Sequence, residues 1–210
     1  MAIKKRPVSP RQKMINLMYV VLMAMLALNV STEVLNGFSI VEESLNRTTN
    51  NSSKENQALY SDFEAQMKSN PEKVKAWFDK AREVRRMSDS LYNFADELKI
   101  AIVKEADGKN GDVHNIVSKE DLEASTQVML APGRGQGKQL FNSINSFRER
   151  ILKMISDEGQ KAIIRSNLST QIPKKAHALG KNWQEYLFEN MPVAAAVTLL
   201  SKLQSDVRYA

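Results

Sequence analysis

The stretch MINLMYVVLMAMLALNV, Met14 to Val30, is the most apolar segment of this 210-residue chain and sets its architecture. Its 17 residues form about 26 Å of helix at about 1.5 Å per residue, near the lower limit for crossing a hydrocarbon core of about 30 Å. Residues 31–35 can extend this helix outward, since Ser and Thr hydroxyls can satisfy local backbone carbonyls. We therefore expect a single transmembrane helix over residues 14–36.

A basic tail followed by an apolar run is also typical of a secretory signal peptide. A cleavage site of the A-x-A kind does not follow the run, because the chain after Ala27 reads Leu28, Asn29 and Val30. The chain also lacks cysteine, which lipoprotein processing requires. We therefore interpret residues 14–36 as a retained membrane anchor.

The distribution of charge predicts how the anchor is oriented. Residues 1–13 contain five Lys or Arg and no acid, whereas the remainder of the chain has 25 basic and 24 acidic residues. The positive-inside rule places residues 1–13 in the cytoplasm and residues 37–210 across the membrane, which in a Gram-negative cell is the periplasm. Because nearly all of the net charge of +6 lies in the tail, it indicates topology rather than a nucleic-acid-binding surface.

Residues 37–210 have the periodicity of helices. The apolar series from Val74 to Ile102 keeps helical phase for nearly 30 residues. The series is preceded by Asn70-Pro71-Glu72, which combines a capping side chain, a proline for the first helical position and an acid, and Asp107-Gly108 ends it. Weaker series predict helices at residues 38–45, 59–67, 139 to about 156, and from near Pro192 to the last residue.

Several segments between these helices are less regular. The polar stretch 46–53 indicates a weak point in the helix that follows the membrane, and residues 112–130 are ambiguous, with residues 118–121 resembling a helix start. Residues 132–138 read as a loop, and residues 157–173 have little periodicity.

The predicted fold class is all-α: one N-terminal transmembrane helix and then a periplasmic bundle. About four main helices in antiparallel, up-and-down order form one core, and about 170 residues is an ordinary size for a single domain. The last helix is still amphipathic at Ala210, so we expect the natural protein to continue.

The residue content gives no support for an enzyme, a metal site or a cofactor. In the run GRGQGK, Pro132 stands where a phosphate-binding loop needs glycine, and Gln139 stands where it needs a hydroxyl. The histidines, His114 and His177, have no local Cys or acidic partner at metal-ligand spacing. The carboxylates alternate with Lys and Arg, as solvated helix faces do.

Polar residues within and beside the apolar stretch are the candidate functional residues. Each helical residue turns by about 100°, so several residues share one line along the helix. These are Arg11, Met18, Leu22, Met25 and Asn29. Asn16 and Tyr19 form a second pair, one turn apart. One interpretation places these groups at the membrane interfaces. The other places them in contacts with helices inside the membrane, where polar groups hydrogen-bond between helices and Met packs adaptively. A helix that only tethers a domain gains nothing from such groups, each of which has a cost in lipid.

The run SPRQKMINLMYVVLMAMLALNVSTEVLNGF, Ser9 to Phe38, closely resembles the N-terminus of the GldM/PorM family. These are inner-membrane motor proteins of the type IX secretion system and gliding machinery of Bacteroidetes. The resemblance implies a homodimer whose membrane helices insert into a ring of a GldL/PorL-type partner. It also implies contact with outer-membrane-associated periplasmic components through further C-terminal domains. An essential glutamate of the ring is the implied ion partner of Arg11, and Tyr19 matches a polar position near it.

The resemblance implies a motor driven by the proton motive force, with the membrane helices as a central shaft and the periplasmic part transmitting torque. Nothing in the sequence decides between protons and sodium, or gives the ring stoichiometry. The alternative is a static periplasmic scaffold or interaction protein with a membrane tether. A chemoreceptor-like sensor is disfavoured, because residues 1–13 are too few to form a cytoplasmic signalling module.

Overall fold

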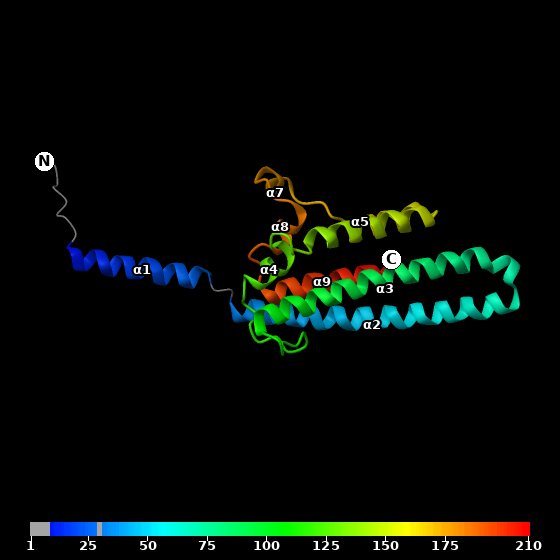
Figure 1. The fold of residues 1–210 in the computed structure, drawn as a ribbon, viewed down its shortest axis with the longest axis horizontal. Coiled ribbons are helices and arrows are strands. Elements are labelled where there is room, and N and C mark those ends of the chain that lie inside the picture. Colours follow the sequence, from blue (N-terminus) through cyan, green and yellow to red (C-terminus); the bar gives the residue numbers. More distant parts are fainter. Residues whose placement is uncertain (1–8, 29–30) are drawn as a thin grey trace.

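The computed structural model describes residues 9–28 and 31–210, and within these ranges all regular secondary structure is helical (Figure 1). The longer helices are α1 (Pro10–Leu28), α2 (Thr32–Ser69), α3 (Pro71–Asp107), α5 (Gly137–Met154) and α9 (Val193–Tyr209). The shorter helices are α4 (Ala124–Leu130), α6 (Glu158–Asn167), α7 (Lys174–Ala178) and α8 (Trp183–Phe188). The all-helical prediction is therefore confirmed for the described residues.

Helices α1 and α2 are separate elements, although the sequence predicted one helix through residues 31–35. Ser31 has extended backbone angles, φ −63° and ψ 141°, and its side chain accepts a hydrogen bond from the Val34 backbone N–H. The Ser31 hydroxyl therefore caps a new helix instead of satisfying a carbonyl of the preceding one, and the predicted extension is wrong. Across residues 9–28 and 31–210, the structure contains no helix with both the length and the apolar character that a membrane span requires.

Helices α2 and α3 form a long antiparallel hairpin. With 38 and 37 residues, they extend for roughly 55 Å at about 1.5 Å per residue. The turn lies at Asn70, which ends α2 and precedes Pro71 at the start of α3, and Gly108 ends α3. Both boundaries of α3 are as the sequence predicted.

The predicted weak point at residues 46–53 does not exist, since α2 continues through it. Its polar side chains bond back along the helix instead of competing with it. The Asn46 side chain donates to the Glu42 carboxylate at 2.8 Å, and the Thr48 hydroxyl donates to the Ser44 carbonyl at 3.0 Å. Thr49 is 3% exposed, so this segment is also held by tertiary packing.

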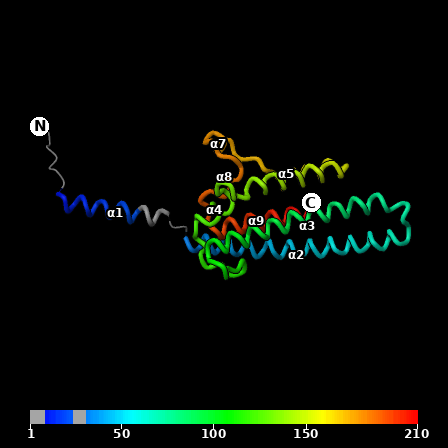
Figure 2. The backbone as a smooth tube through the Cα atoms, viewed as in Figure 1, coloured from blue at the N-terminus to red at the C-terminus, as the bar shows by residue number. Residues whose placement is uncertain are grey.

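Helix α9 lies along the hairpin and contacts both α2 and α3 (Figures 1 and 2). It begins after Pro192, as predicted, with the small buried residues 194–196, which let the neighbouring helices approach closely. The Thr198 hydroxyl donates to the Phe38 carbonyl, and further along both helices the Asn56 side chain donates to the Arg208 carbonyl. Helices α9 and α2 are therefore parallel, and the prediction of strict up-and-down order is wrong.

The chain returns to the base of the hairpin through the segment that the sequence left irregular, and this return makes α9 parallel to α2. Helix α6 is capped by Asp157, whose side chain accepts a hydrogen bond from the Gln160 backbone N–H. The Arg148 guanidinium of α5 donates to the Leu168 carbonyl at 2.7 Å. Near the base, the Ser125 hydroxyl of α4 bonds the Phe188 and Met191 carbonyls.

Gly135 and Gly137 of the GRGQGK run serve packing, whereas Gly133 adopts a positive φ of 73° and faces open space. A Cβ at Gly137 would lie 2.7 Å from the Gln184 Cβ of α8 and 2.9 Å from the Met129 carbonyl oxygen. A Cβ at Gly135 would lie 2.7 Å from that same oxygen. These residues lack side chains because the loop passes against α4 and α8, which accounts for them without a phosphate ligand.

The loop between α3 and α4 closes the base of the bundle. The Asp107 carboxylate accepts hydrogen bonds from the Val117 and Ser118 backbone N–H groups, both at 2.8 Å. Burial opposes its ionisation, but these backbone bonds together with the Ser118 hydroxyl hold the pKa of Asp107 below its ordinary value. The loop also caps α9, because the Val193 N–H donates to the Asp121 carbonyl at 3.0 Å.

Candidate functional site

Helix α1 carries the polar residues that the sequence singled out, and it begins with a cap. The Ser9 hydroxyl accepts a hydrogen bond from the Gln12 backbone N–H at 3.3 Å. Arg11 follows in the first turn, is exposed, and has no acidic neighbour in that turn. A guanidinium at the positive end of a helix dipole is unfavourable by itself.

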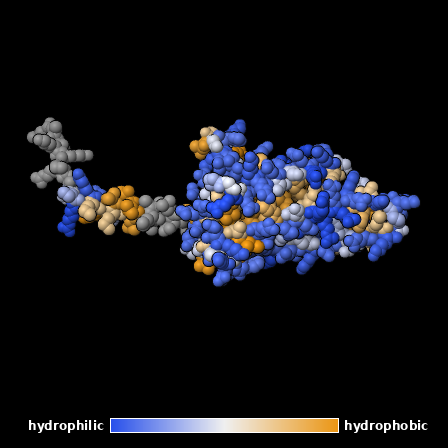
Figure 3. Space-filling view, viewed as in Figure 1, coloured by the Kyte–Doolittle hydropathy of each residue, from blue (hydrophilic) through white to orange (hydrophobic). Residues whose placement is uncertain are grey.

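The described apolar side chains of α1 are exposed as well. The exposed fractions are 70% for Met14, 64% for Leu17, 72% for Met18 and 53% for Leu22. Figure 1 shows α1 projecting away from the bundle, and Figure 3 shows hydrophilic side chains at its start followed by apolar ones. Exposed apolar surface costs about 25 cal/mol per Å² in water. A continuous apolar surface of this kind marks a contact with lipid or with another protein.

The structure places most of the predicted site residues. Because α1 is an unbroken helix, Arg11, Met18 and Leu22 share one face. The Asn16 side-chain oxygen accepts from the Gln12 side chain at 3.2 Å, and Tyr19 is 63% exposed. Met25 belongs to α1, but its side chain lies outside the described residues, as does the whole of Asn29. The roles of all seven residues stay predictions.

The bundle contains a buried polar network between α2, α3 and α9, which we call the polar seam. The Ser201 hydroxyl donates to the Glu42 carboxylate at 3.0 Å and accepts from the Lys99 ammonium at 3.2 Å. The ammonium is also 3.5 Å from the Asp96 carboxylate, and that carboxylate accepts from the Gln204 side chain at 3.3 Å. Lys99, Ser201 and Gln204 are all at most 4% exposed. The seam therefore ties the three helices together inside the bundle.

A second polar cluster ties the same helices near the last turn of α9. The Arg208 guanidinium pairs with the Asp89 carboxylate at 2.6 Å and lies over the Tyr92 ring at 4.4 Å. The Asn56 side chain of α2 donates to the Arg208 carbonyl at 2.8 Å. Burial raises the pKa of Tyr92, with the Asp96 carboxylate acting in the same direction and Arg208 opposing it. Two polar layers thus hold the C-terminal half of α9 against α2 and α3.

The helical domain matches the family model of the GldM N-terminal domain over residues 33–210. The chain belongs to the GldM family. The matched region includes nearly all of α2 and every later helix, so the GldM domain is the helical bundle itself. No curated protein matches the chain.

Membership in the GldM family makes this protein a component of the gliding and type IX secretion machinery, and the family is membrane-anchored. Helix α1 precedes the matched region. The interpretation of α1 as the membrane anchor therefore rests on the resemblance carried by residues 9–38.

Sequence reasoning missed the polar residues inside this GldM bundle. Lys99 follows Ala95 by four residues and precedes Ile102 by three, so it occupies the buried face of α3. Gln204 follows Leu200 by four residues and lies on the buried face of α9 in the same way. Helical phase alone was the signal that could have identified both residues.

Proposed function

We propose that this protein is the motor subunit of a proton-driven inner-membrane complex that powers type IX secretion and gliding. The observation that supports the proposal most strongly is α1, an exposed apolar helix with Arg11 in its first turn, joined to a GldM domain. In this proposal, residues 1–13 lie in the cytoplasm, α1 lies in the membrane, and the bundle lies in the periplasm. The protein acts as a homodimer and carries out no catalysis.

A ring of partner subunits accounts for the exposed side chains of α1. Met18 and Leu22 lie on the same face as Arg11, so a helix that covers the apolar residues also comes close to the guanidinium. Flexible Met side chains suit a surface that must contact successive subunits in turn. A lipid environment would also cover the apolar residues and supply headgroup phosphates to Arg11, but it would not provide a carboxylate whose ionisation changes.

The proposed energy conversion depends on a carboxylate in the ring. A carboxylate in a low-dielectric site has a raised pKa and prefers to be neutral, whereas the guanidinium of Arg11 stays charged. The subunit next to Arg11 is therefore the one whose carboxylate ionises. Two central helices cannot present the same contact to every subunit of a larger ring. Successive protonation then moves the favoured contact around the ring and turns the helices.

The driving force is adequate in size. The membrane potential supplies about 2.3 kcal/mol per charge per 100 mV. A hydrogen bond to a charged group contributes about 1.5–3 kcal/mol, so one translocated proton matches one broken contact. The α2–α3 hairpin, held to α9 by the polar seam and by the Arg208 cluster, is a stiff element suited to transmit the torque.

The test is the substitution Arg11→Ala in the full-length protein of a gliding, type IX-secreting cell. We expect secretion and gliding to be lost while the protein still co-purifies with the partner ring. Lys13→Ala is the matched control, because it removes a positive charge of the same tail from a different face and should leave secretion intact. Normal secretion by the Arg11→Ala strain would refute the proposed charge role.

The ranking of the other α1 residues is tested by Tyr19→Phe and Asn16→Leu. Each change removes hydrogen bonding of about 1 kcal/mol, so we expect partial defects. If both variants lose secretion as fully as Arg11→Ala, the guanidinium is not the principal group.

The extended α2–α3 hairpin also suits a static periplasmic scaffold. Replacing residues 10–28 by an unrelated membrane helix separates the two functions. A scaffold keeps secreting after this exchange, whereas a motor stops.

A further inference from the structure

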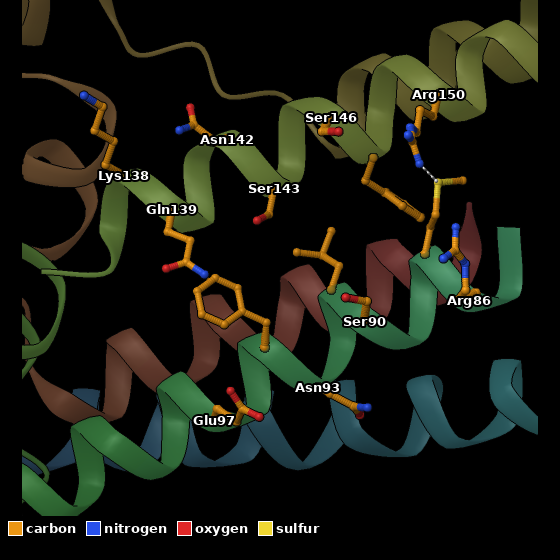
Figure 4. A pocket seen from close by; sticks show the side chains of 14 residues that line it. Arg86, Ser90, Asn93, Glu97, Lys138, Gln139, Asn142, Ser143, Ser146 and Arg150 are labelled. Atoms are coloured by element: carbon orange, nitrogen blue, oxygen red, sulfur yellow. Dashed lines mark hydrogen bonds between the residues drawn. The ribbon is translucent and has the colours of Figure 1, made fainter. Parts of the chain in front are cut away.

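A groove of about 1050 Å³ runs along the side of the bundle between α3 and α5. Its side chains come from both helices and converge on the space between them (Figure 4). None of the polar groups that link α2, α3 and α9 lines it, and it is separate from α1. The functions assigned above therefore leave this surface unexplained.

The floor of the groove is apolar and continuous with the core. Leu91 and Phe147 are 4% exposed and belong to the core, and the partly buried Met87 and Phe94 pack against them. Figure 3 shows an apolar strip along this face of the bundle between hydrophilic flanks. A floor of this kind can bury the apolar stripe of an incoming helix.

The walls of the groove are polar but mostly uncharged. They consist of Ser90 and Asn93 from α3 and Gln139, Asn142, Ser143 and Ser146 from α5. Most of these side chains are short, so they leave the groove open and present hydroxyl and amide groups along its length. Such walls suit the flanks of an amphipathic helix.

The charges of the groove lie at its two ends. Because α3 and α5 are antiparallel, Arg86 lies near Arg150 at one end, and Glu97 lies toward Lys138 at the other (Figure 4). Arg150 is 3.8 Å from the Glu83 carboxylate, but Arg86, Lys138 and Glu97 form no ion pair among the described residues. The lining therefore contains three cationic side chains and one carboxylate.

The length of the groove fits a short helix. From Arg86 to Glu97 the axis of α3 advances by about 17 Å, which equals about three turns of helix. An apolar stripe with i, i+3, i+4 and i+7 spacing would lie on the floor over this distance. We propose that the groove binds an acidic amphipathic helix of a partner protein, with its carboxylates at the end formed by Arg86 and Arg150.

A segment of the same chain is a poor occupant. Helices α3, α5 and α9 already bury their apolar faces in the core of the bundle. The exposed apolar helix, α1, carries Arg11 and Lys13 at its start, and these charges would be repelled by Arg86 and Arg150. Charge complementarity therefore favours a separate, acidic partner.

The experiment measures fluorescence anisotropy of a labelled 14-residue peptide with the 210-residue chain in nanodiscs of zwitterionic lipid. The probe peptide has Leu or Phe at positions 1, 4, 5, 8, 11 and 12 and Glu at most other positions, and a second peptide has Lys in place of every Glu. We expect the acidic peptide to bind at least tenfold more tightly than the basic peptide. Binding should also weaken in high salt, since the contacts at the cationic end are exposed.

Two variants locate the binding. Arg86→Glu combined with Arg150→Glu should weaken binding of the acidic peptide at least tenfold, and Asn142→Trp should abolish it by filling the groove. The control is Arg134→Glu combined with Arg165→Glu, which makes the same charge change outside the groove and should alter binding less than twofold. All of these residues are exposed, and circular dichroism checks that each variant is folded.

Three results would overturn the proposal: no binding of the acidic peptide, equal binding of both peptides, or equal loss in the groove and control variants. Self-association of the chain that disappears with the Arg86 and Arg150 reversal would also overturn it, because the occupant would then be a second copy. The assay does not involve Arg11, so its outcome is independent of the motor function proposed above.

Discussion

The buried ammonium of Lys99 provides a sharp test of how the bundle is held together. Lys99 is 4% exposed, and its ammonium has the Ser201 hydroxyl at 3.2 Å and the Asp96 carboxylate at 3.5 Å. The methylenes of the side chain pack in the bundle, whereas the charge must be stabilised by these two groups. Replacing Lys99 by Ala and by Met separates the contribution of packing from that of charge.

Lys99→Ala removes three buried methylenes, which contribute about 2.4 kcal/mol at about 0.8 kcal/mol each. The remaining cavity raises the total loss to about 3 kcal/mol after relief of the buried charge is allowed for. Lys99→Met keeps the volume and removes the charge. The side chain of Asp96 is 47% exposed, so water solvates the carboxylate that is left behind. We therefore expect the free energy of unfolding of the Met variant to stay within about 1 kcal/mol of the parent.

The measurement is thermal unfolding of the full chain followed by far-ultraviolet circular dichroism. One kcal/mol corresponds to about 2–4 °C for a domain of 150–250 residues, so the Ala variant should melt about 6–12 °C below the parent and the Met variant within about 4 °C of it. If Lys99→Met is as destabilised as Lys99→Ala, the ammonium contacts dominate over packing and the reasoning is wrong. Ser201→Ala, which removes the hydroxyl that links Glu42 to Lys99, would then show the same large loss.

Four further substitutions test the local structure. Gly137→Ala should lower the free energy of unfolding by about 1–3 kcal/mol, because its Cβ would collide with backbone and side-chain atoms. Gly37→Ala should raise the free energy of unfolding by up to about 1 kcal/mol, since its Cβ meets open space within α2. Equal changes for the two variants in urea unfolding would contradict the packing explanation for Gly137. The folded-state pKa of Asp107 is lowered, so its stabilisation is present above about pH 4 and is lost as the pH falls through that pKa. Asp107→Asn should therefore be about 1–2 kcal/mol less stable than the parent at pH 7, and a difference that grows as the pH falls from 7 toward 2 would refute this. Burial raises the pKa of Asp206, with Lys202 opposing, so the folded state binds the proton of this carboxyl more tightly than the unfolded state does. In unfolding experiments, the parent should therefore gain stability relative to Asp206→Asn as the pH falls from 7 to 4. A loss of relative stability over this range would contradict the raised pKa.

The sequence predicted those parts of the fold that are determined by local chemistry. The boundaries of α3 follow from proline at its first position and glycine after its last, and the start of α9 follows from Pro192. The prediction failed where an alternative partner was available. Ser31 was able to satisfy a carbonyl behind it or an N–H ahead of it, and only the structure shows that it caps α2.

The tertiary arrangement of the helices was the second feature that the sequence did not predict. Helices of suitable length suggest alternating directions, but the segment containing α6, α7 and α8 returns the chain to the base and leaves α9 parallel to α2. The periodicity of residues 38–45 and 59–67 predicted helix but not its burial, and Val41 is 49% exposed and Leu59 is 59% exposed. Exposure depends on neighbours that are distant in sequence, which a local pattern does not contain.

The candidate site was predictable to different degrees in its two parts. The polar residues of α1 stand out because their neighbours are apolar, and a family resemblance gives them roles. The polar seam lies among charged residues that look ordinary in the sequence, since the bundle has many Lys and Glu side chains on solvated faces. Lys99 differs from them in helical phase alone, and phase becomes decisive only when the partner helix is known.

The polar contacts between α2 and α9 also explain how α2 is held in register. Leu35 is the one buried apolar residue of α2 among its described residues, so burial of apolar surface specifies little about the position of α2 along α9. The hydrogen bonds to Thr198, Ser201 and the Arg208 carbonyl occur at successive levels along both helices. A shift of α2 by one residue would rotate its side chains by about 100° and break all of them together. A helix fixed in this way resists sliding and twisting against its neighbours, which is the mechanical property that the proposed transmission of torque requires.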